Sequence, residues 1–313
     1  MRLWLLGRPN GGVRRGGDQL QLEECAALAT KHAMDVVLTG EASTIRPRSG
    51  DCVHLFNLQR CPDWGDLPER TKEAGARLLI TPLFHSTDLY HRRGRRGPSR
   101  AAALLVRDAD RFESLRWGGR SPRRRAGEIL PLADGLLLSH ADEEGLIRSW
   151  LGDALTPFSN EPSWKVVPVA IPIRESLDFT GVELELPWPE FVLCAGRVEP
   201  LKNTTLVAQV CEELDLPLVL VGADPGLRHR GYRERAAQRA LWFGQLAPEQ
   251  VRALMVQARV HVLASWAEVV GRVSLEAALE GAAVVCSDVG FGPDYLGRQN
   301  EGVFVFKPGS RQG

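Results

Sequence analysis

Two glutamates, Glu268 and Glu276, stand eight residues apart between a short apolar run and a helical pattern. The run at residues 260–264 is rich in β-branched and aliphatic residues, which predicts a buried strand. The apolar spacing beyond Glu268 predicts a helix that ends at Gly281. Glu268 would then lie in the loop that leaves the strand, and Glu276 in the helix. Ligands of open α/β sheets bind beyond the carboxyl ends of strands, where helix N-terminal amides favour an anion.

Two cations, Arg197 and Lys202, stand five residues apart after another apolar run at residues 191–195. A further run, at residues 218–221, ends in a glycine. Each feature also has an ordinary explanation, because a loop acid, an acid near a helix start and a surface cation pair are common in solvated loops. Their order along the chain is what favours a functional site.

This order resembles the C-terminal domain of the retaining family 4 glycosyltransferases, which have the GT-B fold. The matching features are Gly196-Arg197 at a strand end, Lys202 five residues after the arginine, a strand ending in Val221-Gly222, and the pair Glu268-x7-Glu276. The resemblance covers residues 190–308 closely and the N-terminal half more loosely. It implies an α/β fold of two Rossmann-like domains that face each other across a cleft. Related chains continue past the last strand, so the C-terminal domain is expected to be truncated.

The length of 313 residues predicts two domains. We expect an N-terminal, acceptor-side domain over residues 1–172, a proline-containing linker over 173–189, and a nucleotide-sugar-binding domain over 190–313. Strands are expected in the first domain at Arg2–Leu6, Asp35–Thr39, Asp51–Phe56, Arg77–Thr81, Ala133–Ser139 and Lys165–Val169. Helices are expected at Asp18–His32, Ala101–Leu115, His140–Trp150, Lys202–Leu214, Tyr232–Ala240 and Pro248–Ala258.

The resemblance assigns Arg197, Lys202 and Glu268 to catalysis. The two cations would stabilise the departing nucleoside diphosphate, and Glu268 would accept hydrogen bonds from the donor sugar or steady positive charge at its anomeric carbon. Glu276 would accept hydrogen bonds from the ribose. Retaining transfer in this family is described as front-face attack with the leaving phosphate as base, so no protein nucleophile is assigned. The other donor-binding residues expected in this domain are Gly196, Val270, Gly271, Arg272 and Val273.

No cofactor and no metal are expected, since the two cations can replace a divalent ion. The six cysteines form no C-x-x-C pair, which predicts a reduced protein without a zinc site. One departure from the family is Val269, which stands where a glycine is usual. Valine resists positive φ, so backbone contacts to the sugar are expected to differ.

Two N-terminal features are also candidates for donor binding. Gly16 and Gly17 precede the first expected helix, as is usual in the family, although a plain flexible loop explains glycines equally well. His85 follows the strand Arg77–Thr81 and could hydrogen-bond a donor hydroxyl or an acceptor. A lone loop histidine is more often without a function.

The segment 90–125 contains twelve arginines and three acidic residues. It is either a solvated surface or, over residues 91–125, a contact with an anionic membrane, a lipid phosphate or an acidic glycan. Aromatic residues do not interleave the arginines, so nucleic acid is not expected as a partner. No run of about 18 apolar residues predicts a spanning helix.

We therefore expect a metal-independent hexosyltransferase that moves a hexose, with retention, from a nucleoside-diphosphate sugar to a glycan or lipid-linked acceptor. Such an enzyme would serve polysaccharide biosynthesis in the cytoplasm, at the inner face of the membrane if the basic segment binds there. Two alternatives stay open. One is a catalytically idle GT-B-like binding subunit, which the expected truncation and the altered Val269 favour, and the other is a GT-B nucleotide-sugar epimerase.

Overall fold

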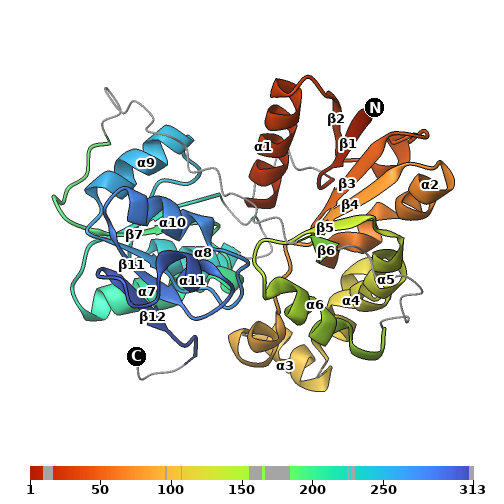
Figure 1. Ribbon diagram of the computed structural model, residues 1–313. Coiled ribbons are helices and arrows are strands. Elements are labelled where there is room, and N and C mark those ends of the chain that lie inside the picture. Colours follow the sequence, from red (N-terminus) through yellow and green to blue (C-terminus); the bar gives the residue numbers. More distant parts are fainter. Residues whose placement is uncertain are drawn as a thin grey trace. The chain divides into compact units, whose positions relative to one another are not determined.

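The computed structural model describes residues 1–9, 17–95, 97–106, 108–154, 164–165, 184–223, 226 and 230–309. The chain divides into two compact units (Figure 1). The first comprises Met1–Ser86 and Val106–Pro172, and the second comprises Thr87–Leu105 and Ile173–Gly313. The segment Thr87–Leu105 thus packs with the second unit, although the sequence places it inside the first predicted domain.

The first unit contains a parallel sheet whose described strands follow the order β2-β1-β3-β4-β5-β6. Short, mostly apolar runs form these strands, and β3 is buried along its whole length. The expected strands are found with small changes at their ends, except that residues 166–169 of the last one lie outside the described residues. The bounds are β1 (Arg2–Leu6), β2 (Asp35–Thr39), β3 (Cys52–Phe56), β4 (Arg77–Thr81), β5 (Gly135–Leu137) and β6 (Trp164–Lys165).

Helices and short helical turns connect these strands, as parallel pairing requires. The core of this unit gathers side chains of β3, β4 and β5 with those of the helix α5 (Pro122–Ile129) and the turn η2 (Leu58–Trp64). The other helices are α1 (Gly17–Lys31), α2 (Leu67–Glu73), α4 (Ala109–Ser114) and α6 (Glu143–Leu151). The other turns are η1 (Ala42–Thr44), η4 (Leu115–Trp117), η5 (Leu130–Leu132) and η6 (Gly152–Ala154).

The second unit contains a parallel sheet in the order β12-β11-β10-β7-β8-β9 among its described strands. Counted along the chain, this is the order of the dinucleotide-binding Rossmann fold, with the first strand, β7, beside the fourth, β10. The strand order reverses between these two neighbours, which pair at Val192 with Val260 and Leu193 with His261. The bounds are β7 (Val192–Ala195), β8 (Leu218–Val221), β9 (Leu241–Trp242), β10 (Val260–Leu263), β11 (Ala283–Ser287) and β12 (Val303–Phe306).

Helices cover both faces of this second sheet, as the figure shows from the side (Figure 1). Side chains of α7 (Thr204–Glu213) and α8 (Arg230–Ala237) pack on one face. Those of α9 (Pro248–Gln257) and α10 (Arg272–Leu279) pack on the other. The remaining helical elements are η3 (Tyr90–Gly94), α3 (Pro98–Leu105), η7 (Pro200–Lys202) and α11 (Gly292–Leu296). Both sheets confirm the predicted α/β class with two Rossmann-like units.

Two expected helices have different bounds in the structure. The single helix predicted over Ala101–Leu115 is wrong, because α3 ends at Leu105 and α4 begins at Ala109. Asp108 starts α4 by accepting a hydrogen bond from the Arg111 amide, which is the role of an N-cap residue. The helix predicted from Lys202 begins two residues later, since Asn203 adopts a left-handed conformation that ends η7 before α7.

Candidate active site

The carboxyl ends of β7 and β8 approach each other at two glycines. A Cβ atom on Gly222 would lie 1.9 Å from the Gly196 carbonyl oxygen, so only glycine fits at residue 222. The Gly196 amide donates to the Val221 carbonyl at 2.8 Å, and the Gly222 amide donates to the Gly244 carbonyl at 2.7 Å. Three strand ends are thereby held together by backbone contacts. This close packing explains the Val-Gly strand end, whereas the glycine of the Gly-Arg strand end is favoured by its positive φ of 146°.

The two predicted cations lie on the loop that joins β7 to α7. Arg197 directly follows Gly196, is about half exposed, and contacts the Glu199 carboxylate at 3.0 Å. Lys202 ends the turn η7, and its side chain is mostly buried. Lys202 therefore has less freedom than Arg197, whose position at the surface leaves its guanidinium accessible to an anion.

Glu268 lies beyond the carboxyl end of β10, the strand that pairs with β7. Its Oε1 accepts a hydrogen bond from the Ser265 hydroxyl at 2.6 Å and forms an ion pair with the Lys202 Nζ. The loops after β7 and β10 are also joined by the Trp266 amide, which donates to the Leu201 carbonyl at 2.8 Å. The structure thus brings Lys202 and Glu268 together where the strand order of the sheet reverses. Crevices at such points are where open α/β sheets bind ligands.

Glu276 lies on α10, one turn after Arg272. Its Oε1 accepts from the Arg272 Nε at 3.0 Å, so two of the predicted donor-binding residues form an ion pair along the helix. Gly271 precedes α10 as its N-cap residue, and Val273 lies in the first turn. One helix and its N-cap therefore hold four of the predicted residues, Gly271, Arg272, Val273 and Glu276. The two glutamates pair with different cations, Glu268 with Lys202 and Glu276 with Arg272.

A second loop holds the Glu268 loop in place. The Phe291 amide donates to the Val269 carbonyl at 2.6 Å. A Cβ atom on Gly290 would lie 2.4 Å from the Glu268 carbonyl oxygen, and one on Gly292 would lie 2.2 Å from that of Val270. We call these contacts between residues 268–270 and 290–292 the clasp. Sequence reasoning missed the clasp, although the two glycines around Phe291 were its signal.

The same contacts answer the question that Val269 raised. Five residues other than glycine adopt positive φ in the described part of the chain, and Val269 is not one of them. Its carbonyl is used by the Phe291 amide, and the close approach of the two loops is made by Gly290 and Gly292 instead. A valine is therefore accommodated at residue 269 without backbone strain.

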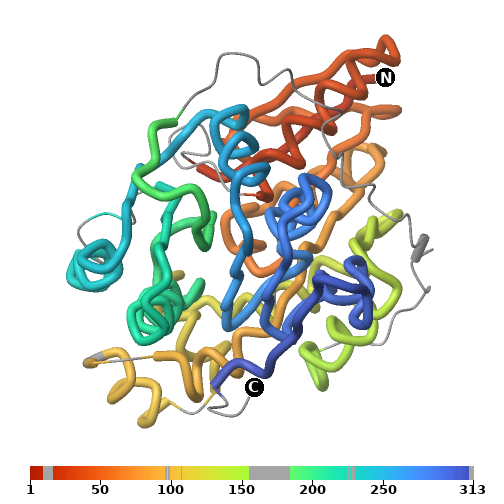
Figure 2. The backbone as a smooth tube through the Cα atoms, turned by 90° about the vertical axis from the view of Figure 1, so that its left-hand side faces the viewer, coloured from red at the N-terminus to blue at the C-terminus, as the bar shows by residue number. Residues whose placement is uncertain are grey.

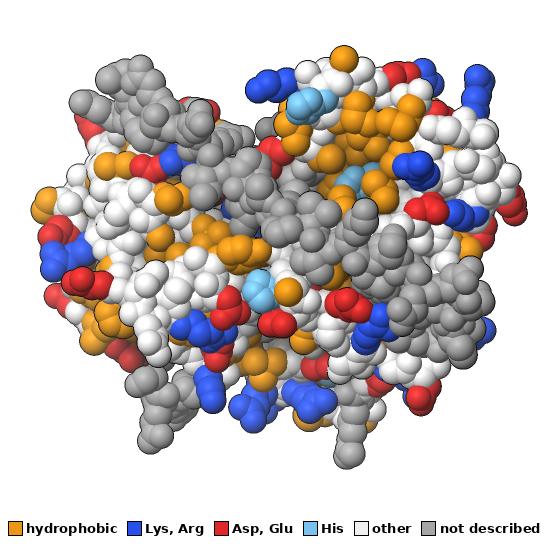
Figure 3. All heavy atoms as spheres, in the orientation of Figure 1, with side chains coloured by type: hydrophobic (Ala, Val, Ile, Leu, Met, Phe, Trp, Pro, Cys, Tyr) orange, Lys and Arg blue, Asp and Glu red, His pale blue; other side chains and the backbone are white. Residues whose placement is uncertain are grey.

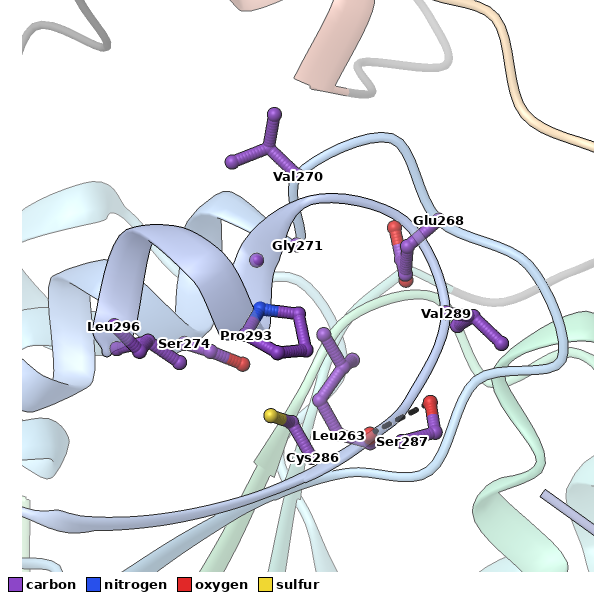
Figure 4. A pocket seen from close by; sticks show the side chains of 11 residues that line it. Leu263, Glu268, Val270, Gly271, Ser274, Cys286, Ser287, Val289, Pro293 and Leu296 are labelled. Atoms are coloured by element: carbon purple, nitrogen blue, oxygen red, sulfur yellow. Dashed lines mark hydrogen bonds between the residues drawn. The ribbon is translucent and has the colours of Figure 1, made fainter. Parts of the chain in front are cut away.

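A small pocket lies behind this loop, lined by ends of β10, β11, α10 and α11 (Figure 4). Ser274 and Cys286 turn into the pocket, whereas the Val270 side chain points away from the other lining residues. The Ser274 side chain is 2% exposed, and its hydroxyl has no hydrogen-bond partner among the described residues. The free volume is about 10 Å³, which is room for about one water molecule. A nucleotide cannot fit inside, so it would have to bind outside this pocket.

In the first unit, Gly17 is exposed and begins α1, while Gly16 lies outside the described residues. Next to this helix start, Arg8 and Asp18 form an ion pair at 2.8 Å and line a small pocket with Gly7. The structure therefore shows that charged residues, and not only glycines, surround this strand–loop–helix unit.

His85 follows β4, and a buried carboxylate fixes the residues beside it. Glu143, at the start of α6, accepts hydrogen bonds from the amides of Phe84 at 2.6 Å and Ser139 at 2.5 Å. Burial raises the pKa of Glu143, while these hydrogen bonds act in the opposite direction. Leu83 adopts a positive φ of 47°, which is rare for leucine and marks a constrained turn before His85. Sequence reasoning missed Glu143, because an acid near a helix start has no distinctive pattern.

Residues 189–313 match the family model of the glycosyl transferases, group 1. No curated protein matches the chain by sequence. Among solved structures, sucrose-phosphate synthase from Thermosynechococcus elongatus is similar with a TM-score of 0.69 and 15% identity, over 99% of this chain and 86% of that one. The chain has the GT-B fold.

Two further GT-B structures are similar over nearly the whole chain. HepE from Anabaena, solved in complex with UDP and glucose, has a TM-score of 0.60 and 17% identity, covering 99% of this chain and 86% of that one. A glycosyltransferase involved in avilamycin A biosynthesis has a TM-score of 0.55 and 14% identity, covering 99% and 85%. The GT-B fold predicted from the sequence is confirmed, and in this fold the group 1 match covers the unit that carries Lys202 and Glu268.

The part of the chain that the structure describes contains no cluster of three histidine, cysteine or carboxylate residues that could hold a metal ion. Within the same residues, none of the helices is long and apolar enough to cross a membrane.

Proposed function

We propose that this protein is a retaining glycosyltransferase that moves a hexose from a nucleoside-diphosphate sugar to a glycan or lipid-linked acceptor. The observation that carries the proposal is the Lys202–Glu268 ion pair, held by Ser265 at the point where the strand order reverses. The group 1 family match of residues 189–313 supports it. So does the presence of UDP and glucose in the HepE complex, whose fold this chain shares.

The leaving diphosphate would be stabilised by Arg197 and Lys202. A guanidinium can bind two phosphate oxygens at once, whereas an ammonium acts as a point charge. Both groups lie on one loop after β7, so their charges can act together on one anion. We propose that these cations take the part that a divalent metal has in other transferases, and that no cofactor is needed.

Binding of the donor would exchange the partners of Lys202. In the structure its ammonium is neutralised by Glu268, and an arriving diphosphate offers it two negative charges. Glu268 would remain oriented by the Ser265 hydroxyl and could then accept hydrogen bonds from the sugar. A carboxylate beside the anomeric carbon stabilises the positive charge that develops there in the transition state. The ribose would be bound by Glu276, whose position Arg272 fixes.

The acceptor side is proposed for the N-terminal unit, where Glu143 orders the loop before His85. We propose that the acceptor is a glycan or a lipid-linked glycan reached at the cytoplasmic face of a membrane, with the basic segment 91–125 in contact with anionic groups there. Nucleic acid remains excluded from the proposal.

Val269 is one of the features that favour the alternative of an idle binding subunit. Since this valine is accommodated without positive φ, it gives no reason for the loop to be inactive. A nucleotide-sugar epimerase would use the same cations but would consume donor without any acceptor. An assay that follows both the donor and the released nucleoside diphosphate, run with and without acceptor glycans, separates the three functions. Transfer requires acceptor-dependent release, an epimerase would consume the donor without acceptor, and a binding subunit would leave the donor unchanged.

The donor can be found first with a thermal-shift panel of UDP-, GDP-, ADP- and TDP-sugars. A ligand that binds the folded protein raises its stability by about 2.7 kcal/mol at one hundred times its dissociation constant. If none of the four classes of nucleotide shifts the melting temperature, the proposed donor class is wrong.

A further inference from the structure

The arginine-rich part of the sequence divides into two surfaces with different properties. In the first unit, four arginines of residues 108–125 have acidic partners: Arg116 with Glu113, Arg123 with Asp108, Arg124 with Glu128, and Arg125 with both Glu69 and Glu128. Charged side chains of both signs are likewise neighbours over much of the face in Figure 3. This second half of the segment largely neutralises itself and offers little net charge to a partner.

The first half, Thr87–Leu105, is different. It contains five arginines and a single acid, Asp88. Arg92, Arg93 and Arg100 are exposed and form no ion pair with any described residue. Positive charge is therefore concentrated on the part of the segment that packs with the second unit, and not on the part that contains the most arginines in sequence.

The helix α3 adds an apolar surface to these cations. Leu104 is 66% exposed and Leu105 is 86% exposed, both in the last turn of the helix. Arg100 precedes Leu104 by four residues, so the two lie on the same helix face. Ala103 is buried, whereas the other side chains that the structure describes in this helix are exposed, including Arg100, Leu104 and Leu105. The two exposed leucines thus place apolar surface beside arginines that form no ion pair with a described residue.

This surface stays attached to the candidate active site. The turn η3 precedes α3, and Gly94 in it packs so closely on the Trp266 indole that a Cβ atom there would lie 2.8 Å from the ring. Trp266 stands two residues before Glu268 and bonds through its amide to Leu201, next to Lys202. The short helix and turn in gold at the lower edge of Figure 2 are this segment. Whatever α3 binds is therefore brought to the loop that carries Glu268.

We propose that Arg92, Arg93, Arg100, Leu104 and Leu105 form a docking surface for an anionic lipid membrane. The arginines match the negative charge of anionic headgroups, and the two leucines can enter the boundary between headgroups and acyl chains. The leucines decide the class of partner, because an acidic glycan or a nucleic acid would leave them exposed to water. The surface binds lipid independently of the proposed transfer reaction, and it specifies which part of segment 91–125 makes the membrane contact.

Vesicle sedimentation with the full chain tests this surface. Vesicles of phosphatidylcholine with and without phosphatidylglycerol are compared, at salt from ~0.05 M to ~0.3 M, over which screening becomes strong. We expect binding only to the vesicles with phosphatidylglycerol, and weaker binding as salt rises. Arg92→Gln/Arg93→Gln/Arg100→Gln should lower the partition coefficient about 100-fold, at about fivefold per arginine. Leu104→Ser/Leu105→Ser should lower it by about tenfold per leucine.

The matched control is Arg116→Gln/Arg123→Gln/Arg124→Gln, which removes the same charge from the paired half of the segment. It should bind the vesicles within about twofold of the wild type, because those arginines already have acidic partners. All variants should keep the melting temperature of the wild type, which shows that they fold. An equal loss in the control, full binding by the leucine variant, or no binding by the wild type would each overturn the proposal.

Discussion

Lys202 and Glu268 are 66 residues apart in the sequence, and their side chains form an ion pair where the neighbouring strands β7 and β10 end. Each residue comes from the loop after its own strand, so the pair exists only because the sheet places the first and fourth strands of the unit side by side. The Ser265 hydroxyl fixes the same carboxylate oxygen. A cation and a carboxylate thus lie together at the carboxyl ends of the two central strands, where a donor would bind.

Removing either cation should weaken nucleoside-diphosphate binding. For Arg197→Ala and for Lys202→Ala we expect a loss of about 1.5–3 kcal/mol each, the size of a hydrogen bond to a charged group. Titration calorimetry with the nucleoside diphosphate of the donor measures it. Arg259→Ala is the matched control, because Arg259 precedes β10 at the opposite end of the strand and pairs with Glu190. Affinity unchanged in both site variants would show that the diphosphate binds elsewhere.

Gly292→Ala should destabilise the protein and disturb the Glu268 loop. The added Cβ atom would lie 2.2 Å from the Val270 carbonyl oxygen, and neither backbone segment can yield easily. We expect a loss of about 1–3 kcal/mol, as for overpacking in a core. Chemical denaturation followed by circular dichroism gives the free energy of unfolding.

Gly145→Ala is the control for this substitution. Gly145 is exposed on α6, and nothing lies within 4 Å of its added Cβ atom. Since alanine favours helix more than glycine does, this variant should gain up to about 1 kcal/mol. Equal effects of the two substitutions would contradict the described clasp between the two loops.

His261 should make the protein less stable in acid. The imidazole is fully buried, neither ring nitrogen has a partner among the described residues, and burial lowers its pKa from 6.5 to about 4. Between the two pKa values the imidazole binds a proton in the unfolded chain but not in the folded chain. The stability of the protein therefore falls as the pH decreases from about 6.5 towards 4. Each such histidine lowers the free energy of unfolding by about 2 kcal/mol when the pH decreases from 7 to 5.

His261→Leu should remove its share of that loss, and His32→Leu, at an exposed position, should not. The free energy of unfolding of both variants is compared with the wild type at pH 7 and pH 5. His54, whose pKa burial lowers to about 3, supplies a similar loss that remains in both variants. A pH dependence identical in all three proteins would mean that His261 is hydrated or paired.

The strands and most of the helices could be predicted because their signals are local. Short, mostly apolar runs that are buried on both faces of a parallel sheet, such as β3, read directly as strands. The predicted chemistry of Lys202, Glu268 and Glu276 depended on the resemblance to a known family, because the order and spacing of these residues match that family. Two of the pairings could not be predicted. Ser265 differs in no visible way from other serines, and Arg272 was expected to bind the donor and not to pair with Glu276.

Sequence periodicity does not report some other features. The start of α4 is set locally, because the Asp108 side chain accepts a hydrogen bond from the Arg111 amide. Two more features depend on contacts between distant parts of the chain. Glu143 is buried because two amides, one of them 59 residues away in sequence, need its oxygens. The packing of Gly94 on Trp266 likewise joins segments that the sequence assigned to different domains.

The most direct test of the proposed function compares Glu268→Gln with Glu276→Gln in release of nucleoside diphosphate from the donor that the thermal-shift panel identifies. Glu268→Gln should lower turnover by 10² to 10³, about 2.7–4 kcal/mol, because its charge matters most as the sugar becomes positive. It should leave the binding of free nucleoside diphosphate nearly unchanged. Glu276→Gln should weaken binding of that free nucleotide as well as of the donor. Wild-type turnover in Glu268→Gln would contradict the account, whereas a large loss confined to turnover is the result that it predicts.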